Sequence, residues 1–190
     1  MQNEKEETKE LLEVVDENDV VIGLEDRNKI HEEGLLHREI HIWFFTPEKE
    51  IIFQHRAKDK DTYPDLLDAT VGGHVEPGDS YEQTAIKESL EETGLELKEE
   101  DFIFLKKMNK KVYDNVTNKI NNTLRVQYAY LHKGGIEDLQ IEEGKAIAFV
   151  KIPLDKILNL TEEEKKKSIP SIIEKDFLEM YTEAVKKLNL

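Results

Sequence analysis

Apolar residues occur along the chain in short clusters separated by polar turns, which indicates a mixture of strands and helices. Residues 14–15 and 20–22 are apolar and flank the polar segment 16–19, so we expect a short hairpin there. Residues 40–45 and 51–53 are strongly apolar, and the polar turn between them predicts two more strands in an antiparallel meander. Further apolar runs predict strands at 102–105, 124–131 and 146–150.

The clearest helix signal begins at Ser80. Ser80 followed by Gln83 has the pattern of a capping box, in which each residue satisfies a free backbone N–H of the other. Gly94 is suited to the left-handed conformation that often ends a helix. We therefore expect a helix from Ser80 to Thr93.

The end of the chain predicts two amphipathic helices separated by Pro170. We expect Thr161 to cap the first with Glu164, and Ser171 to cap the second with Glu174. Apolar residues of the second helix share one face, which we expect to pack against the core; a surface for a partner or a homodimer is the alternative. These residues are Ile173, Phe177, Met180, Tyr181, Ala184 and Leu188.

The charge of the chain narrows the classes of partner. The formal net charge is −15, which repels the phosphates of nucleic acids and of anionic lipids. We therefore expect no nucleic-acid partner and no membrane partner. A small phosphorylated ligand remains compatible with this charge if a metal ion lies between carboxylates and phosphate.

The chain of 190 residues contains no cysteine. This excludes disulfides, thiolate metal sites and thiol nucleophiles. The first ten residues are polar and acidic, unlike a secretory or transit signal. No apolar run approaches the roughly 18–20 residues that span a bilayer. A cytoplasmic protein with a single domain is the resulting expectation.

Three carboxylates lie near the end of the predicted helix. Glu88, Glu91 and Glu92 are spaced by three and four residues, which places them on one side. A solvated acidic face would explain them most simply. However, three such charges repel each other and the negative end of the helix dipole, and bound cations would offset that repulsion. An oxygen-rich site without cysteine suits Mg²⁺ or Mn²⁺.

The segment from Gly73 to Leu95 resembles the Nudix box, G-x5-E-x7-R-E-U-x-E-E-x-G-U, where U is a bulky apolar residue. Asp79 replaces the first Glu, Lys87 replaces Arg, and Ser89 replaces the first bulky residue. An ammonium cannot make the two-pronged contact that a guanidinium makes. The positions that match in register are Gly73, Glu88, Glu91, Glu92, Gly94 and Leu95.

The resemblance implies an α/β fold, the Nudix α/β/α sandwich with a mixed sheet and additional C-terminal helices. Residues 13–158 would form the Nudix domain. Residues 1–12 would be a flexible lead-in, and residues 159–190 would be helices packed on the same domain.

The resemblance also implies a metal-dependent pyrophosphohydrolase that acts on acid anhydrides. Glu88, Glu91 and Glu92 would hold Mg²⁺ or Mn²⁺, and Glu91, Glu92 or Glu143 would help to deprotonate the attacking water. Glu142 is an equally good candidate at the position of Glu143. The substrate would be a nucleoside diphosphate derivative or a related organic diphosphate.

Several other segments look like the Nudix branch related to type I isopentenyl diphosphate isomerase, among them Glu25-Asp26-Arg27 and residues 34–38. In that enzyme, histidines and a pair of Glu residues hold a second metal. His37 and His74 fall on matching positions, and His31 matches with a shift of one residue.

Basic residues also match positions that contact diphosphate in that branch. Arg56 and Lys60 would grip phosphate, and Gly73 would let the glycine loop approach the substrate. Ordinary surface charges are the alternative for Arg56 and Lys60.

The chemistry of the isomerase is missing. Gly72 occupies the position of its catalytic Cys, and the segment Asn121-Asn122-Thr123 occupies the position of its Glu-Asn-Glu segment. Proton transfer to a double bond needs that thiol and that carboxylate. The chain therefore resembles the hydrolases of this branch.

Two alternatives stay open. His37 and His41 are interpreted first as strand histidines hydrogen-bonded at the edge of the core, and His74 as a brace for the glycine loop. Because Lys87 replaces Arg, a domain that binds and senses a nucleotide without turnover is the alternative function.

Overall fold

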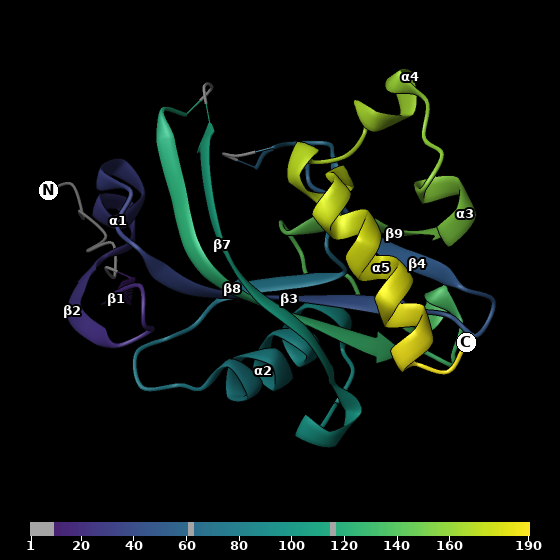
Figure 1. The fold of residues 1–190 in the computed structure, drawn as a ribbon, viewed down its shortest axis with the longest axis horizontal. Helices are drawn as coiled ribbons and strands as arrows, with labels where there is room; N and C mark the ends of the chain where they lie inside the picture. The colour runs from purple at the N-terminus through teal and green to yellow at the C-terminus, as the bar shows by residue number, and fades with distance from the viewer. Residues whose placement is uncertain (1–9, 61–62, 115–116) are drawn as a thin grey trace, which may run out of the picture.

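The computed structural model describes residues 10–60, 63–114 and 117–190, so residues 1–9 of the predicted lead-in lie outside it. Within the described part of the chain, the strands form one sheet (Figure 1). The strands are β1 (Leu11–Val15), β2 (Val21–Asp26), β3 (His37–Phe45), β4 (Glu50–Arg56), β5 (Leu67–Asp68), β6 (Val71–His74), β7 (Ile103–Asp114), β8 (Lys119–Leu131) and β9 (Ala146–Pro153).

Helices lie on both faces of this sheet, with α2 on one side and α5 on the other (Figure 1). The α-helices are α1 (Arg27–Glu33), α2 (Tyr81–Thr93), α3 (Leu154–Ile157), α4 (Glu162–Lys165) and α5 (Lys175–Lys187). Short 3-10 turns occur at Glu99–Asp101, Ile136–Asp138 and Pro170–Ile173. No helix among the described residues is long and apolar enough to cross a bilayer.

Strand β3 is the centre of the sheet. It pairs in parallel with β8 along its whole length, from His37 opposite Thr123 to Phe45 opposite Leu131. Its other edge pairs antiparallel with β1, β6 and β4. The sheet is therefore mixed, and the predicted α/β fold is confirmed, together with the hairpins β1–β2 and β3–β4. The predicted meander is wrong in its strand order, because β1 and not β2 lies beside β3.

Alternate residues of β3 face opposite layers, because successive side chains of a strand point to opposite sides. Ile42 and Phe44 pack with Ala85 of α2 on one side. Trp43 and Phe45 pack with α5 on the other side, where the ring of Tyr181 lies 4.9 Å from the indole of Trp43. The apolar stripe of the last helix therefore packs against the core, as predicted.

Two local predictions are wrong or incomplete. Ser171 does not cap the last helix, because residues 170–173 form a 3-10 turn and α5 begins after Glu174 without a side-chain cap. Strand β1 begins at Leu11, so it takes in the last two residues of the predicted lead-in. Thr161 and Glu164 do form the predicted capping box, although the helix they cap is a single turn.

Helix α1 was not predicted from the sequence. The side chain of Asp26 accepts a hydrogen bond from the backbone N–H of Asn28 and starts the helix. Gly34 ends it in the left-handed conformation, with φ of 67°. Because the helix is short and buries only Ile30, its apolar periodicity is too weak to be seen in the sequence.

We expect the packing of α5 to contribute strongly to stability. Replacing Phe177, which is fully buried against Trp43, by Ala should lower the free energy of unfolding by about 3–5 kcal/mol. Lys186→Ala, on the exposed side of the same helix, should change it by less than about 0.5 kcal/mol. Urea denaturation measures both variants, and equal effects would contradict the assigned packing.

Candidate active site

Helix α2 carries the predicted carboxylates and is fixed at both ends. The capping box of Ser80 and Gln83 is present, and Gly94 ends the helix in the left-handed conformation, as predicted. Glu88 and Glu92 lie one turn apart and both line a cavity of about 470 Å³. Glu91 is exposed and does not line this cavity, so only two of the three carboxylates share it.

Glu92 is almost completely buried, with 1% of its side chain exposed. It accepts a hydrogen bond of 2.8 Å from the amide of Gln54 on β4. Its other oxygen lies 2.7 Å from Nζ of Lys145. Burial raises the pKa of Glu92 to about 7, although Lys145 opposes this change. Burial therefore favours the protonated form of Glu92 more than it would in an exposed carboxyl, and the ion pair with Lys145 favours the charged form.

Glu88 reaches the cavity beside the backbone of Gly73 on β6. A Cβ at Gly73 would lie 2.2 Å from Cδ of Glu88, so only glycine leaves room for this carboxylate. Burial raises the pKa of Glu88, while Lys145 opposes this. Gly73 was predicted to approach the substrate; the structure places it at the wall of the cavity, next to Glu88.

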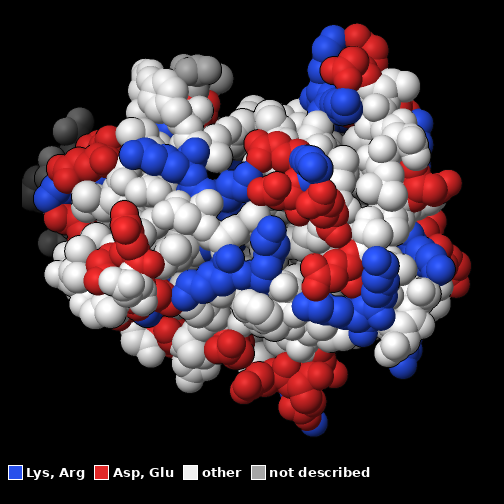
Figure 2. Space-filling model, in the orientation of Figure 1, with Lys and Arg blue, Asp and Glu red and all other residues white. Residues whose placement is uncertain are grey.

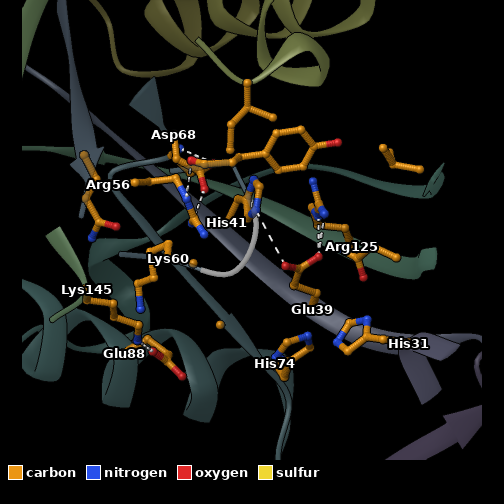
Figure 3. A pocket seen from close by; sticks show the side chains of 18 of the residues that line it. His31, Glu39, His41, Arg56, Lys60, Asp68, His74, Glu88, Arg125 and Lys145 are labelled. Atoms are coloured by element: carbon orange, nitrogen blue, oxygen red, sulfur yellow. Dashed lines mark hydrogen bonds and ion pairs between the residues drawn. The ribbon is translucent and has the colours of Figure 1, made fainter. Parts of the chain in front are cut away.

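The segment before β9 brings Lys145 to these carboxylates (Figure 3). Its Nζ lies 3.2 Å from Glu88 and 3.3 Å from Glu142. Burial opposes its charge, but Glu92 and Glu88 outweigh burial and raise the pKa of Lys145. The sequence did not single out Lys145. It did leave Glu142 and Glu143 as alternatives, and the structure places Glu142 at the site while Glu143 is exposed.

Two predicted phosphate-binding cations line the same cavity. Arg56 is already engaged, because its guanidinium lies 2.9 Å from Asp68 and donates to the carbonyl oxygen of Tyr63. Lys60 and Lys145 both extend into the cavity near Glu88 (Figure 3). Burial and the nearby charge of Arg56 lower the pKa of Lys60. This end of the cavity therefore holds three cations, Arg56, Lys60 and Lys145, beside the carboxylates of Asp68, Glu88 and Glu92.

The local charge differs from what the net charge of the chain indicates. Figure 2 shows elongated groups of Lys and Arg side chains between groups of Asp and Glu on one face. Positive and negative patches thus alternate over short distances, even though the formal net charge is −15. An anionic small molecule can meet a favourable potential within a cavity of such a protein.

Three histidines from separate elements meet at the other end of the cavity. His31 of α1, His37 of β3 and His74 of β6 each offer a ring nitrogen, and these atoms lie within 4.8 Å of one another. Nδ1 of His37 lies 3.0 Å from the carbonyl oxygen of Leu35, which fixes its ring. The buried Nε2 atoms of His37 and His74 have no hydrogen-bond partner among the described residues.

These histidines are expected to be neutral at pH 7. Burial lowers the pKa of His31 to about 4 and that of His74 to about 3. Burial also lowers the pKa of His37. A neutral imidazole is the form that binds a metal ion, so this cluster could hold one.

Further polar atoms next to the cluster lack partners within the described structure. They are Oδ1 of Asn121 and Oγ1 of Thr123, both on β8. Thr123 lies opposite His37 in the β3–β8 register. These residues occupy the positions where the isomerase resemblance predicted carboxylates, so they contribute no negative charge.

Between the two ends of the cavity lies a buried charged network (Figure 3). Glu39 forms a salt bridge with Arg125 at 2.5 Å. Burial alone would raise the pKa of Glu39, but the charge of Arg125 outweighs burial and lowers it. His41 stands next to them, with Nε2 3.9 Å from Glu39 and Nδ1 unpartnered among the described residues. Its ring lies against Gly72, where a Cβ would be 3.1 Å away. His41 was interpreted as a strand histidine hydrogen-bonded at the edge of the core; it is buried in strand β3, but no hydrogen bond of its ring is found among the described residues.

The comparisons with known proteins point in one direction. Residues 35–172 match the family model of the NUDIX domain. The chain is 29% identical over 151 residues to an uncharacterized Nudix hydrolase of Clostridium acetobutylicum, covering 78% of this chain and 72% of that protein. It is 34% identical over 82 residues to the isopentenyl-diphosphate Delta-isomerase of Pectobacterium atrosepticum, covering 43% of this chain and 46% of that enzyme.

Solved structures share the fold at low sequence identity. A crystal structure of a Deinococcus radiodurans protein has a TM-score of 0.68 and 17% identity, and covers 92% of this chain and 99% of that one. The NUDIX domain of Shewanella oneidensis NrtR, complexed with ADP ribose, has a TM-score of 0.54 and 17% identity, covering 80% and 88%. Since the family model covers well over half of the residues, the chain belongs to the NUDIX family.

Proposed function

We propose that the protein is a metal-dependent pyrophosphohydrolase that cleaves a nucleoside diphosphate derivative or a related organic diphosphate. The observation that carries this proposal is the pair of carboxylates formed by the half-buried Glu88 and the buried Glu92, which line one cavity and both contact the ammonium of Lys145. Family membership supports hydrolysis in general. The local cations of the cavity support a diphosphate as the group that is bound.

The residues present fit a divalent cation. The ammonium of Lys145 is a stand-in ion, since it lies within 3.3 Å of oxygens from Glu88, Glu92 and Glu142. A hard divalent ion such as Mg²⁺ or Mn²⁺ prefers such oxygen ligands. When bound, this ion would neutralise diphosphate charge and acidify a water molecule. Glu91, one turn from Glu88, would join from the exposed side.

The remaining roles belong to side chains of the cavity. We assign the task of accepting a proton from water to Glu142 in place of Glu143, because Glu142 contacts the same ammonium of Lys145 as Glu88 and Glu92 do. Glu92, with its pKa of about 7, is the alternative acceptor. Lys60 would bind phosphate directly, while Arg56, held by Asp68, would present a positioned guanidinium.

The histidine cluster would hold a second metal ion in this proposal. His31, His37 and His74 supply three neutral donors, and Thr123, which lies opposite His37, adds no negative charge. We do not propose an isomerase reaction, because the chain has no thiol. At Gly72, the position of the isomerase cysteine, the ring of His41 lies 3.1 Å from where a Cβ would be. Isopentenyl diphosphate therefore serves as a substrate expected to give no isomer.

A binding domain without turnover is the second candidate. Lys87, at the Arg position of the box, forms a 2.5 Å ion pair with Glu76 and so bridges α2 to the preceding loop. The NUDIX domain of NrtR, a neighbour in fold only, was crystallised with ADP ribose. Measuring phosphate release from a panel of nucleotides and organic diphosphates with Mg²⁺ separates the two candidates, since a sensor would bind a panel compound without releasing phosphate.

The first kinetic prediction compares a proposed metal ligand, Glu92, with a proposed phosphate-binding residue, Lys60. On the best substrate of the panel, Glu92→Gln should lower kcat at least about 100-fold, because a buried ligand charge is lost. Lys60→Ala should mainly raise KM, by roughly tenfold, because a charge-assisted hydrogen bond is shared by ground and transition states. Steady-state kinetics measures both parameters.

The exposed Lys133→Ala variant is the control and should behave like the wild-type protein. A near-normal kcat for Glu92→Gln would show that α2 is not the catalytic helix. The binding-domain alternative would then be favoured.

A second prediction concerns the neutral histidines. Burial and the nearby Arg125 lower the pKa of His41 to about 4, below its ordinary value of 6.5. As pH falls from about 6.5 to about 4, His41 becomes protonated in the unfolded chain but stays neutral in the folded protein. The free energy of unfolding therefore decreases over this range. In His41→Gln, the decrease in the free energy of unfolding between pH 7 and pH 4 should be smaller by up to about 3 kcal/mol. Urea denaturation of metal-free protein between pH 7 and 4 measures it, and parallel curves for both proteins would refute it.

A further inference from the structure

Lys145 touches the same carboxylate oxygens that the proposed function assigns to a divalent cation. Its Nζ lies 2.7 Å from Glu92, 3.2 Å from Glu88 and 3.3 Å from Glu142. Resting on that proposed function, we propose that Lys145 is an internal competitor of the metal. Its ammonium holds the ligands together in the metal-free protein and must leave them before the divalent cation binds.

The backbone of Lys145 is fixed, so only its side chain has to move. Its N–H donates to the carbonyl oxygen of Glu142, and its carbonyl oxygen accepts from the N–H of Ala57, each at 3.1 Å. The next residue, Ala146, pairs with Arg56 in the β4–β9 ladder. The side chain is 28% exposed and has a flexible four-carbon stem, which allows the ammonium to swing without disturbing the sheet.

The competition follows from the burial of the carboxylates. Without a cation, Glu88 and Glu92 would face each other across one helical turn in a poorly solvated site. Lys145 removes this repulsion and so stabilises the metal-free protein. The ion pairs with Lys145 must break before a metal ion can bind these carboxylates. The free energy of breaking them is subtracted from that of metal binding, so Lys145 should weaken the apparent affinity for the metal.

The displaced ammonium has a place to go. Lys60 and Lys145 extend into the same end of the cavity (Figure 3), where phosphate is expected to lie. After displacement, Lys145 gains a new partner only if an anion is present there. Metal and diphosphate would therefore promote each other's binding through this one side chain.

The experiment compares Mg²⁺ binding by Lys145→Met, Lys60→Met and the wild-type protein. Mg²⁺ favours oxygen over imidazole, so the histidine cluster should contribute little to the signal. The melting temperature is measured in EDTA and across a Mg²⁺ titration. Lys145→Met should melt at a lower temperature in EDTA, and should bind Mg²⁺ at least about tenfold more tightly than wild type.

Lys60→Met is the matched control, because it removes a lysine charge from the same cavity without breaking the ion pairs. Its Mg²⁺ affinity should change by less than about threefold. Lys145→Arg keeps the charge and should bind Mg²⁺ about as weakly as wild type. If Lys145→Met folds only with metal, its refolding on addition of Mg²⁺, followed by circular dichroism, supports the inference, and a failure to refold contradicts it.

Two results would overturn the inference for a Lys145→Met variant that is folded in EDTA: a Mg²⁺ affinity equal to or weaker than that of the wild-type protein, or an equal gain in affinity in Lys60→Met. A failure of the proposed function looks different. Introducing Glu92→Gln into the wild-type protein or into Lys145→Met should abolish the Mg²⁺-induced rise in melting temperature if Glu92 is a ligand. An unchanged response would show that the metal binds elsewhere, whatever the effect of Lys145.

Discussion

The burial of Glu88 and Glu92, one turn apart on α2, is the constraint on which the site depends, because buried carboxylates need a positive charge close by. Several elements meet this need together. The wall of β6 is glycine at position 73, which admits the Glu88 carboxylate. Gln54 of β4 donates a hydrogen bond to one oxygen of Glu92, and Lys145, just before β9, contacts the other. The sheet therefore brings distant segments of sequence to one acidic pair.

One face of the central strand β3 contributes to the hydrophobic core at one end and to the polar cavity at the other. On the side of α5, Trp43 and Phe45 are buried in the core beneath the helix. Further back along the same face, His37, Glu39 and His41 are polar and lie in or beside the cavity. Because the pleat places all odd-numbered residues on one side, one strand can support a packed core at one end and a polar site at the other. Family membership in the NUDIX group fits this arrangement, in which the helix and the strand face supply different groups to one cavity.

Local signals in the sequence were sufficient for the elements that carry strong caps or long apolar runs. Ser80, Gln83 and Gly94 defined α2 correctly, since capping depends on residues three or four positions apart. The same reasoning failed at Ser171, which lies inside a 3-10 turn whose Ile172 is fully buried. Long-range partners could not be predicted, because the contact between Lys145 and Glu88 spans 57 positions. The choice between Glu142 and Glu143 likewise depended on the turn before β9, where neighbouring residues point to different sides.

In the proposed mechanism, Glu88 and Glu92 bind a divalent cation, and the ammonium of Lys145 moves away when the cation binds. Anomalous diffraction from crystals grown with Mn²⁺ locates the ion directly and records the position of Lys145 in the same map. We predict a peak between these two carboxylates, with the ammonium moved out of contact with Glu92. A map in which Lys145 still bridges the carboxylates, with no peak beside them, would contradict this account.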